Sequence, residues 1–152
     1  MKNNWIILIV IAVILVVGYL FLTSNKTVTS PPVDEQNVSE IEAGSENIVL
    51  SEQNSSGESG TASLVGVNGQ VVVTLSLTGF KAGVEQPAHI HVGACPDVGA
   101  VSYPLTNVLD GVSVTTLDVT LEQLKGEQPL GINVHESTDN PQNYVSCGDL
   151  AL

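Results

Sequence analysis

From Asn47 onward the chain is a series of short β-branched runs separated by Gly, Asn and Pro. The clearest run is 70–78, QVVVTLSLT, in which every second residue is aliphatic, as expected of a strand with one buried face. Asn68-Gly69 directly precedes it and is the strongest short hairpin signal. The other expected strands lie at 48–50, 59–67, 87–93, 113–119, 132–135 and 144–147. Seven or eight short strands in roughly 105 residues favour an all-β antiparallel sandwich or barrel.

Only one helical turn is expected in this part of the chain. Thr120 can act as the N-cap, Gln123 stands three residues later and completes a capping box, and Gly126 can end the helix. A fold that alternates strands and helices would need further helices, which the pattern does not contain.

The N-terminus carries an 18-residue run without charge, WIILIVIAVILVVGYLFL, at 5–22. As a helix it would span about 27 Å, close to the hydrocarbon thickness of a bilayer, and aromatic residues stand at both ends. The alternative is a cleaved signal peptide, but the run is longer than a typical apolar signal region and no A-x-A site follows. We therefore expect a single-pass transmembrane helix. No cysteine directly follows the run, which excludes a lipoprotein anchor.

The charges around this run predict its orientation. Lys2 and the terminal amine precede it, whereas Lys26 alone follows before acidic residues begin. The positive-inside rule then predicts a cytoplasmic tip at 1–4 and an extracytoplasmic remainder. Residues 23–45, rich in Ser, Thr, Asn, Pro and Glu, indicate a disordered acidic linker.

The remaining segment, 46–152, is the expected folded domain. It holds twelve acidic residues and two lysines, a net charge of −10, within a chain whose net charge is −12 and which contains no arginine. Such a chain cannot neutralise a phosphate backbone, so nucleic-acid binding is excluded as a function.

The chain's three histidines fall on two expected strands. His89 and His91 are two residues apart, so they share a strand face about 7 Å apart, and His135 lies on another strand. Together they could bind one metal ion, and neutral imidazole suits copper and zinc. The alternative is that these histidines only form hydrogen bonds at a surface.

Cys95 and Cys147 are the only cysteines. A disulfide between them would close a loop of roughly 50 residues, for which the chain-entropy model gives about 4 kcal/mol. The alternative is a metal site that includes cysteine, but the two residues do not have the close spacing of metal-ligand pairs. We expect the disulfide.

In its order of motifs, the stretch from Ile48 to Leu152 resembles the copper/zinc superoxide dismutase family. A strand, a Gly-rich turn and a second strand come first, followed by a hairpin, a long strand and the H-x-H strand AHIHVG. Cys95 follows shortly. Near the end stand VHESTD (134–139) and SCGDL (146–150), which match that family's V-H-E-x-x-D and A-C-G motifs. The AHIHVG and NVH segments also resemble CHRD domains.

The resemblance implies an antiparallel Greek-key β-sandwich or barrel. It places His89, His91 and His135 on three copper ligands and places Cys95 and Cys147 on the disulfide of the family. Asp139 corresponds to an aspartate that supports the metal ligands without touching the metal.

Several departures from the family limit the expected activity. No further histidine remains to bridge copper to zinc or to bind zinc, so we expect one copper ion and no zinc. No arginine is available beside the copper to attract superoxide, and a net charge of −10 repels an anion. The resemblance therefore implies at most a weak dismutase. The alternative function is a non-catalytic CHRD-like structural or adhesion module of the cell envelope.

Overall fold

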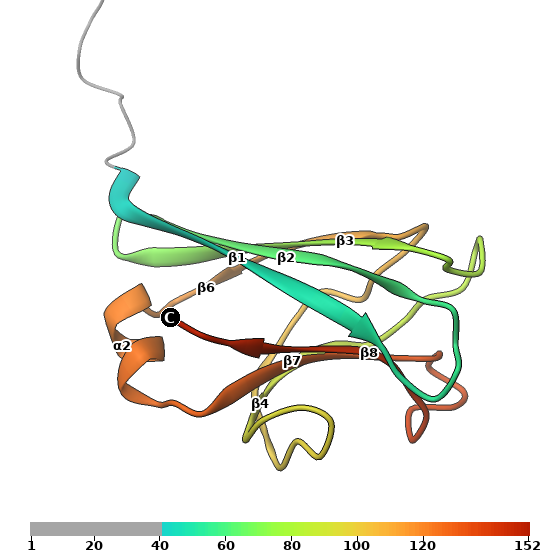
Figure 1. Cartoon of the computed structure of the whole chain (residues 1–152). Coiled ribbons are helices and arrows are strands. Elements are labelled where there is room, and N and C mark those ends of the chain that lie inside the picture. Colours follow the sequence, from blue (N-terminus) through green and yellow to red (C-terminus); the bar gives the residue numbers. More distant parts are fainter. Residues whose placement is uncertain (1–40) are drawn as a thin grey trace, which may run out of the picture. The chain divides into compact units, whose positions relative to one another are not determined.

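The computed structural model describes residues 41–152 and folds them into eight strands and one short helix (Figure 1). The strands are β1 (Ile41–Glu52), β2 (Ser59–Val67), β3 (Gln70–Thr78), β4 (Ala88–Val92), β5 (Val101–Pro104), β6 (Val112–Leu117), β7 (Leu130–His135) and β8 (Tyr144–Leu150). The helix, α2, covers Leu121–Gly126. β1 begins ahead of Glu46, where we placed the start of the domain.

The strands form one nearly closed antiparallel sheet in the order β5-β4-β7-β8-β1-β2-β3-β6. β1 joins the two halves, because it pairs with β2 over most of its length and with β8 at Ser51 and Glu52. In Figure 1, β1, β2, β3 and β6 make one layer and β4, β7 and β8 lie in the layer opposite. The expectation of an all-β antiparallel sandwich or barrel is confirmed.

Local sequence signals account for the turns. Asn68 and Gly69 connect β2 to β3 with φ angles of 52° and 76°, which both lie in the left-handed region that a two-residue type I′ hairpin needs. At α2, the Thr120 hydroxyl accepts from the Gln123 amide at 3.1 Å, and the Gln123 side chain accepts from the Thr120 amide at 2.8 Å. The predicted hairpin and capping box are both confirmed.

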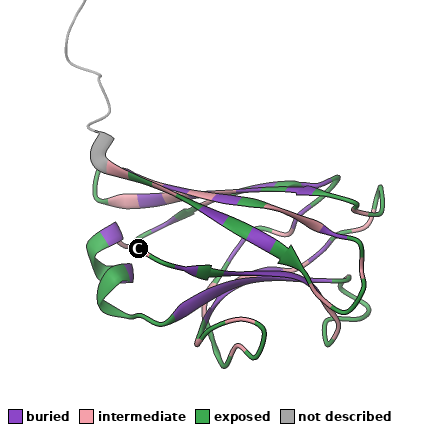
Figure 2. Cartoon of the chain, in the orientation of Figure 1, coloured by how far each residue is buried: buried purple, intermediate pink, exposed green. Residues whose placement is uncertain are grey.

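The buried core is aliphatic. Figure 2 shows buried segments on strands of both layers. In β3 the predicted inward residues are all buried, while the residues between them are at least partly exposed. The largest fully buried aliphatic side chains are Leu50, Leu64, Leu75, Ile90, Leu124, Leu130, Ile132 and Leu150. Burial of this kind stabilises the fold by about 25 cal/mol for each Å² of apolar surface removed from water.

No helix within residues 41–152 is long and apolar enough to cross a membrane. The predicted transmembrane helix at 5–22, the tip at 1–4 and nearly all of the predicted linker at 23–45 lie outside the described residues.

Candidate metal centre

The two histidine-bearing strands are neighbours in the sheet. β4 pairs with β7 in antiparallel register, which sets His89 opposite Asn133 and His91 opposite Gly131. Ala88 and Ile90 are fully buried in the core. His89 and His91, which alternate with them, therefore lie on the outer face of this half of the sheet.

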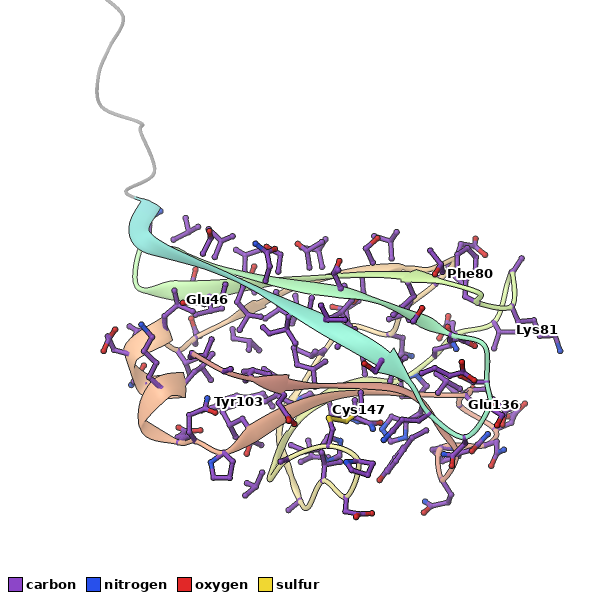
Figure 3. The ribbon with its side chains drawn as sticks, in the orientation of Figure 1. Glu46, Phe80, Lys81, Tyr103, Glu136 and Cys147 are labelled. Carbon is purple, nitrogen blue, oxygen red and sulfur yellow. A yellow bond between two sulfur atoms is a disulfide. The ribbon has the colours of Figure 1, made fainter. Side chains whose placement is uncertain are left out.

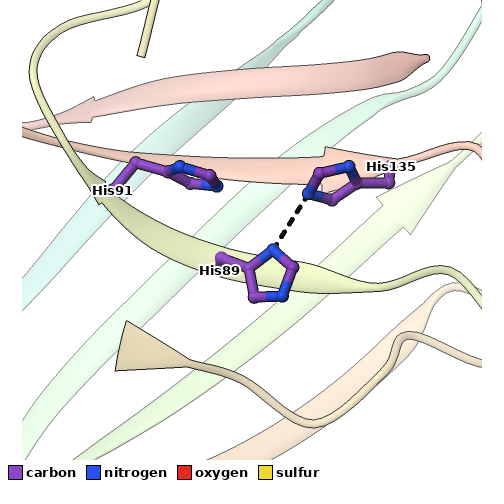
Figure 4. Close-up of side chains that lie close together, drawn as sticks. All are labelled: His89, His91 and His135. Atoms are coloured by element: carbon purple, nitrogen blue, oxygen red, sulfur yellow. Dashed lines mark hydrogen bonds between the residues drawn. The ribbon is translucent and has the colours of Figure 1, made fainter. Parts of the chain in front are cut away.

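The three histidines converge on this face although they come from two strands (Figure 4). One nitrogen from each ring lies within 4.8 Å of the other two. The closest pair is His89 Nδ1 and His135 Nε2, which are 2.9 Å apart. His91 and His135 are buried, and His89 is half-buried. The three rings therefore form one cluster that could hold a metal ion.

Backbone carbonyls fix which nitrogen of two rings carries a proton. The Nδ1 of His91 lies 2.9 Å from the carbonyl oxygen of Gly99, and the Nδ1 of His135 bonds to the carbonyl oxygen of Pro141. A carbonyl oxygen only accepts, so both Nδ1 atoms must donate. In the neutral rings this leaves Nε2 unprotonated, with a lone pair available to a metal.

Within the cluster, the Nε2 of His91 gives the strongest indication of a missing ligand. It is buried and has no hydrogen-bond partner among the described residues. An unpaired buried polar atom costs roughly 1–3 kcal/mol, so most such atoms in proteins have a partner. A metal ion would supply one here.

Burial also favours the neutral form of His89 and His135. Desolvation lowers the pKa of His89 below its ordinary 6.5, and the two neighbouring histidines lower it further. Desolvation likewise lowers the pKa of His135, although its bond to the Pro141 carbonyl opposes part of this effect. Neutral imidazole is the form that binds metals, so the surroundings favour the metal-binding state.

The disulfide between Cys95 and Cys147 is present, with the Cα atoms 5.9 Å apart, which confirms the predicted bridge and removes both sulfurs as metal ligands. It ties the loop after β4 to β8. The amide of Cys95 also donates to Asp149 at 2.7 Å, and the amide of Gly93 donates to the Pro129 carbonyl at 2.8 Å. This loop carries Gly99, so the bridge helps to hold the acceptor that orients His91.

The sequence analysis did not identify two neighbours of the cluster as site residues. The ring of Tyr144 lies edge-on to that of His135, with centroids 4.8 Å apart. Asn133 lies on β7, on the face that carries the histidines. It pairs with a residue of β4 on one side and with a residue of β8 on the other. Its position two residues before His135 could have identified it, because alternate strand residues share a face.

Asp139 lies in the loop after β7 and lines a cavity of about 390 Å³. Glu58, Lys81 and Glu136 line the same cavity, and Figure 3 shows Lys81 and Glu136 at one end of the domain. The atom bonded to His135 is the Pro141 carbonyl oxygen rather than a carboxylate. The supporting role that the resemblance gives to Asp139 stays a prediction.

No protein-family model matches this chain, and no curated protein or solved structure matches it either. The function must therefore be argued from the geometry of the site.

Proposed function

We propose that this chain is a membrane-anchored, extracytoplasmic domain that binds one copper ion through His89, His91 and His135. The main observation in favour of this proposal is that the buried Nε2 of His91 has no hydrogen-bond partner among the described residues. One nitrogen from each of the three rings also lies within 4.8 Å of the other two, which supports a single ion bound by all three.

The donor set favours copper over zinc. Among divalent ions, nitrogen sites bind copper most tightly.

The fold supports a likeness to the superoxide dismutase family. The connections β3–β4 and β6–β7 each pass from one half of the sheet to the other, as a Greek-key topology requires. The disulfide supports an extracytoplasmic location, because such bridges persist in oxidising compartments. The apolar run at 5–22 supplies the anchor.

A bound copper ion would supply one-electron chemistry, but the chain's charges oppose fast superoxide dismutation. Glu136 directly follows His135, and hydrogen bonds from Asn143 and Asn140 lower the pKa of its carboxyl, so it is ionised at neutral pH. The domain has no arginine and only two lysines against twelve acidic residues: Lys125 lies 3.3 Å from Glu122, and the charge of Lys81 acts on Glu136. An anionic substrate is therefore repelled rather than steered to the site. We propose weak dismutase activity or none.

Competition titrations with copper and zinc on the full-length protein test this function. Wild type should bind copper more tightly than zinc, and each single substitution of His89, His91 or His135 by alanine should weaken copper binding sharply. Ser113→Ala is the matched control, because Ser113 also carries a buried unpartnered side-chain atom but lies on β6 in the other half of the sheet. If neither ion binds above background, the metal function fails and a CHRD-like structural role replaces it.

A further inference from the structure

Asn133 is a polar residue in the middle of the histidine-bearing face. It pairs with His89 on one side and with Cys147 on the other. Side chains of directly opposed strand residues have Cβ atoms about 4.5–5.5 Å apart. His135 lies two residues along the same strand and therefore on the same face. Asn133 is thus next to two of the three proposed copper ligands.

The side chain of Asn133 is fully buried, and its Oδ1 has no hydrogen-bond partner among the described residues. Ser146 and Ser113 also carry unpartnered atoms, but they lie away from the histidines: Ser146 pairs with Val134, whose side chain is in the core, and Ser113 is on β6. On the face that carries the histidines, the unpartnered atoms are His91 Nε2 and Asn133 Oδ1.

A chain of hydrogen bonds fixes which atom of the Asn133 carboxamide is left without a partner. The Pro96 carbonyl can only accept, so the nitrogen of Gln53 donates to it, at 3.4 Å. The oxygen of Gln53 is then the atom turned to Asn133, and it accepts from Nδ2 at 3.1 Å. The unpartnered atom of Asn133 is therefore the oxygen, which needs a donor.

The neighbouring histidines do not provide this donor. His135 Nδ1 donates to Pro141 and His91 Nδ1 donates to Gly99. Since the neutral His135 ring has its lone pair on Nε2, the nearby Nδ1 of His89 donates to that atom. The Oδ1 of Asn133 is thus an acceptor without a donor beside a cluster with lone pairs.

We propose that the Oδ1 of Asn133 accepts a hydrogen bond from a water molecule on the bound copper, and that it thereby favours Cu(II) over Cu(I). This inference rests on the proposed function. Three histidines leave a coordination position open for water. Cu(II) keeps additional oxygen ligands, whereas Cu(I) is satisfied by two or three nitrogens, so an acceptor for the water stabilises the oxidised ion selectively. Asn133 acts through the water and is a positioning residue, not a copper ligand.

The test measures the affinities of the full-length protein for Cu(II) and for Cu(I), each by competition with a chelator. Asn133→Leu has a similar shape but no acceptor, and it should weaken Cu(II) binding about tenfold while leaving Cu(I) binding unchanged. Gln53→Leu is the matched control, because it breaks the bond to Nδ2 but leaves Oδ1 in place. It should keep the wild-type ratio of the two affinities.

A conservative variant separates the oxygen from the carboxamide as a whole. Asn133→Asp keeps an acceptor oxygen and loses the donor to Gln53, so it should retain or strengthen the preference for Cu(II). In wild-type protein, pulsed electron paramagnetic resonance of Cu(II) should also show exchangeable protons from a bound water, and this signal should weaken in Asn133→Leu.

The results separate this inference from the proposed function. If Asn133→Leu binds one copper per chain with the wild-type ratio of affinities, the copper site stands and the inference is wrong, with Oδ1 bonded to an ordinary buried water. If Gln53→Leu changes the ratio as much as Asn133→Leu does, Asn133 has a structural role only. If wild type binds no copper, both proposals fail.

Discussion

His89 Nδ1 lies 2.9 Å from His135 Nε2, although the two residues are 46 positions apart in the chain and come from neighbouring strands. The same separation suits a hydrogen bond between neutral rings and a right angle at a shared metal ion. A metal ion could therefore take the place of the proton that these two rings share. The pairing of β4 with β7 and the carbonyls of Gly99 and Pro141 position the histidine rings.

Loss of the disulfide should weaken both the fold and the copper site. Replacing Cys95 and Cys147 together by serine removes a crosslink between positions 52 residues apart, which the chain-entropy model values at about 4 kcal/mol of unfolding free energy. Copper affinity should fall as well, because the loop that carries Gly99 loses its tether to β8. Urea unfolding and a chelator titration measure the two effects. Ready alkylation of the cysteines in unreduced wild-type protein would show that the disulfide is absent and would contradict the expected loss of stability.

The capping box of α2 offers a test of stability away from the metal site. Thr120→Ala removes the acceptor for the Gln123 amide and should lower the free energy of unfolding by about 1 kcal/mol. Copper affinity should not change. Thr120→Ser keeps the hydroxyl and should restore most of the loss. Equal unfolding midpoints for Thr120→Ala and wild type would show that this cap contributes nothing.

The metal-free domain should lose stability as the pH falls below about 6.5. In the unfolded chain, histidines take up protons near that pH. Burial lowers the pKa of His89 and His135 in the folded domain, so there they stay neutral to lower pH. The unfolded state then binds more protons than the folded state, and acid favours unfolding. Urea midpoints at pH 7.5 and 5.5 measure this loss.

A matched variant separates the effect of the histidines on stability from that of other titrating groups. Burial raises the pKa of Glu58 above its ordinary 4.5, so Glu58 contributes stability at low pH and loses it as the pH rises through the raised value, which is the opposite direction. Replacing His89 and His135 together by asparagine should reduce the acid loss of stability. An unchanged or higher wild-type midpoint at pH 5.5 would mean that the histidines do not control this window.

The anchor can be tested without the metal. Full-length protein should sediment with membranes and resist carbonate extraction, because the run at 5–22 is long enough to cross a bilayer. Protease added from the extracytoplasmic side should release the domain by cutting within 23–45. A mature chain that begins beyond Leu22 would instead indicate a cleaved signal peptide.

Local signals made much of the fold predictable. The alternation in β3, the Asn68-Gly69 turn and the capping box at Thr120 each depend on residues close together in sequence, and each is found in the structure. β5 was not among the expected strands, because it has only four residues and ends at Pro104. A short edge strand is defined by its partner, here β4, more than by its own composition.

The candidate site was predictable only in part, for the same reason. The His89–His91 spacing indicates a shared face, and the position of His135 on another expected strand made it the candidate third ligand, which the resemblance to superoxide dismutases supported. The carbonyls of Gly99 and Pro141 carry no sequence signal, since any residue has a backbone oxygen. The hydrogen bonds from Asn133 to Gln53, and from Gln53 to Pro96, join residues that lie far apart in the chain.

Electron paramagnetic resonance of the copper-loaded full-length protein tests the central claim most directly. After desalting, wild type should retain one Cu(II) per chain, and its spectrum should show coupling to three imidazole nitrogens. His91→Ala should lose one of these nitrogens and most of the copper, whereas Ser113→Ala should match wild type. Wild-type protein that retains no copper, or a spectrum that does not change in His91→Ala, would contradict the three-histidine site.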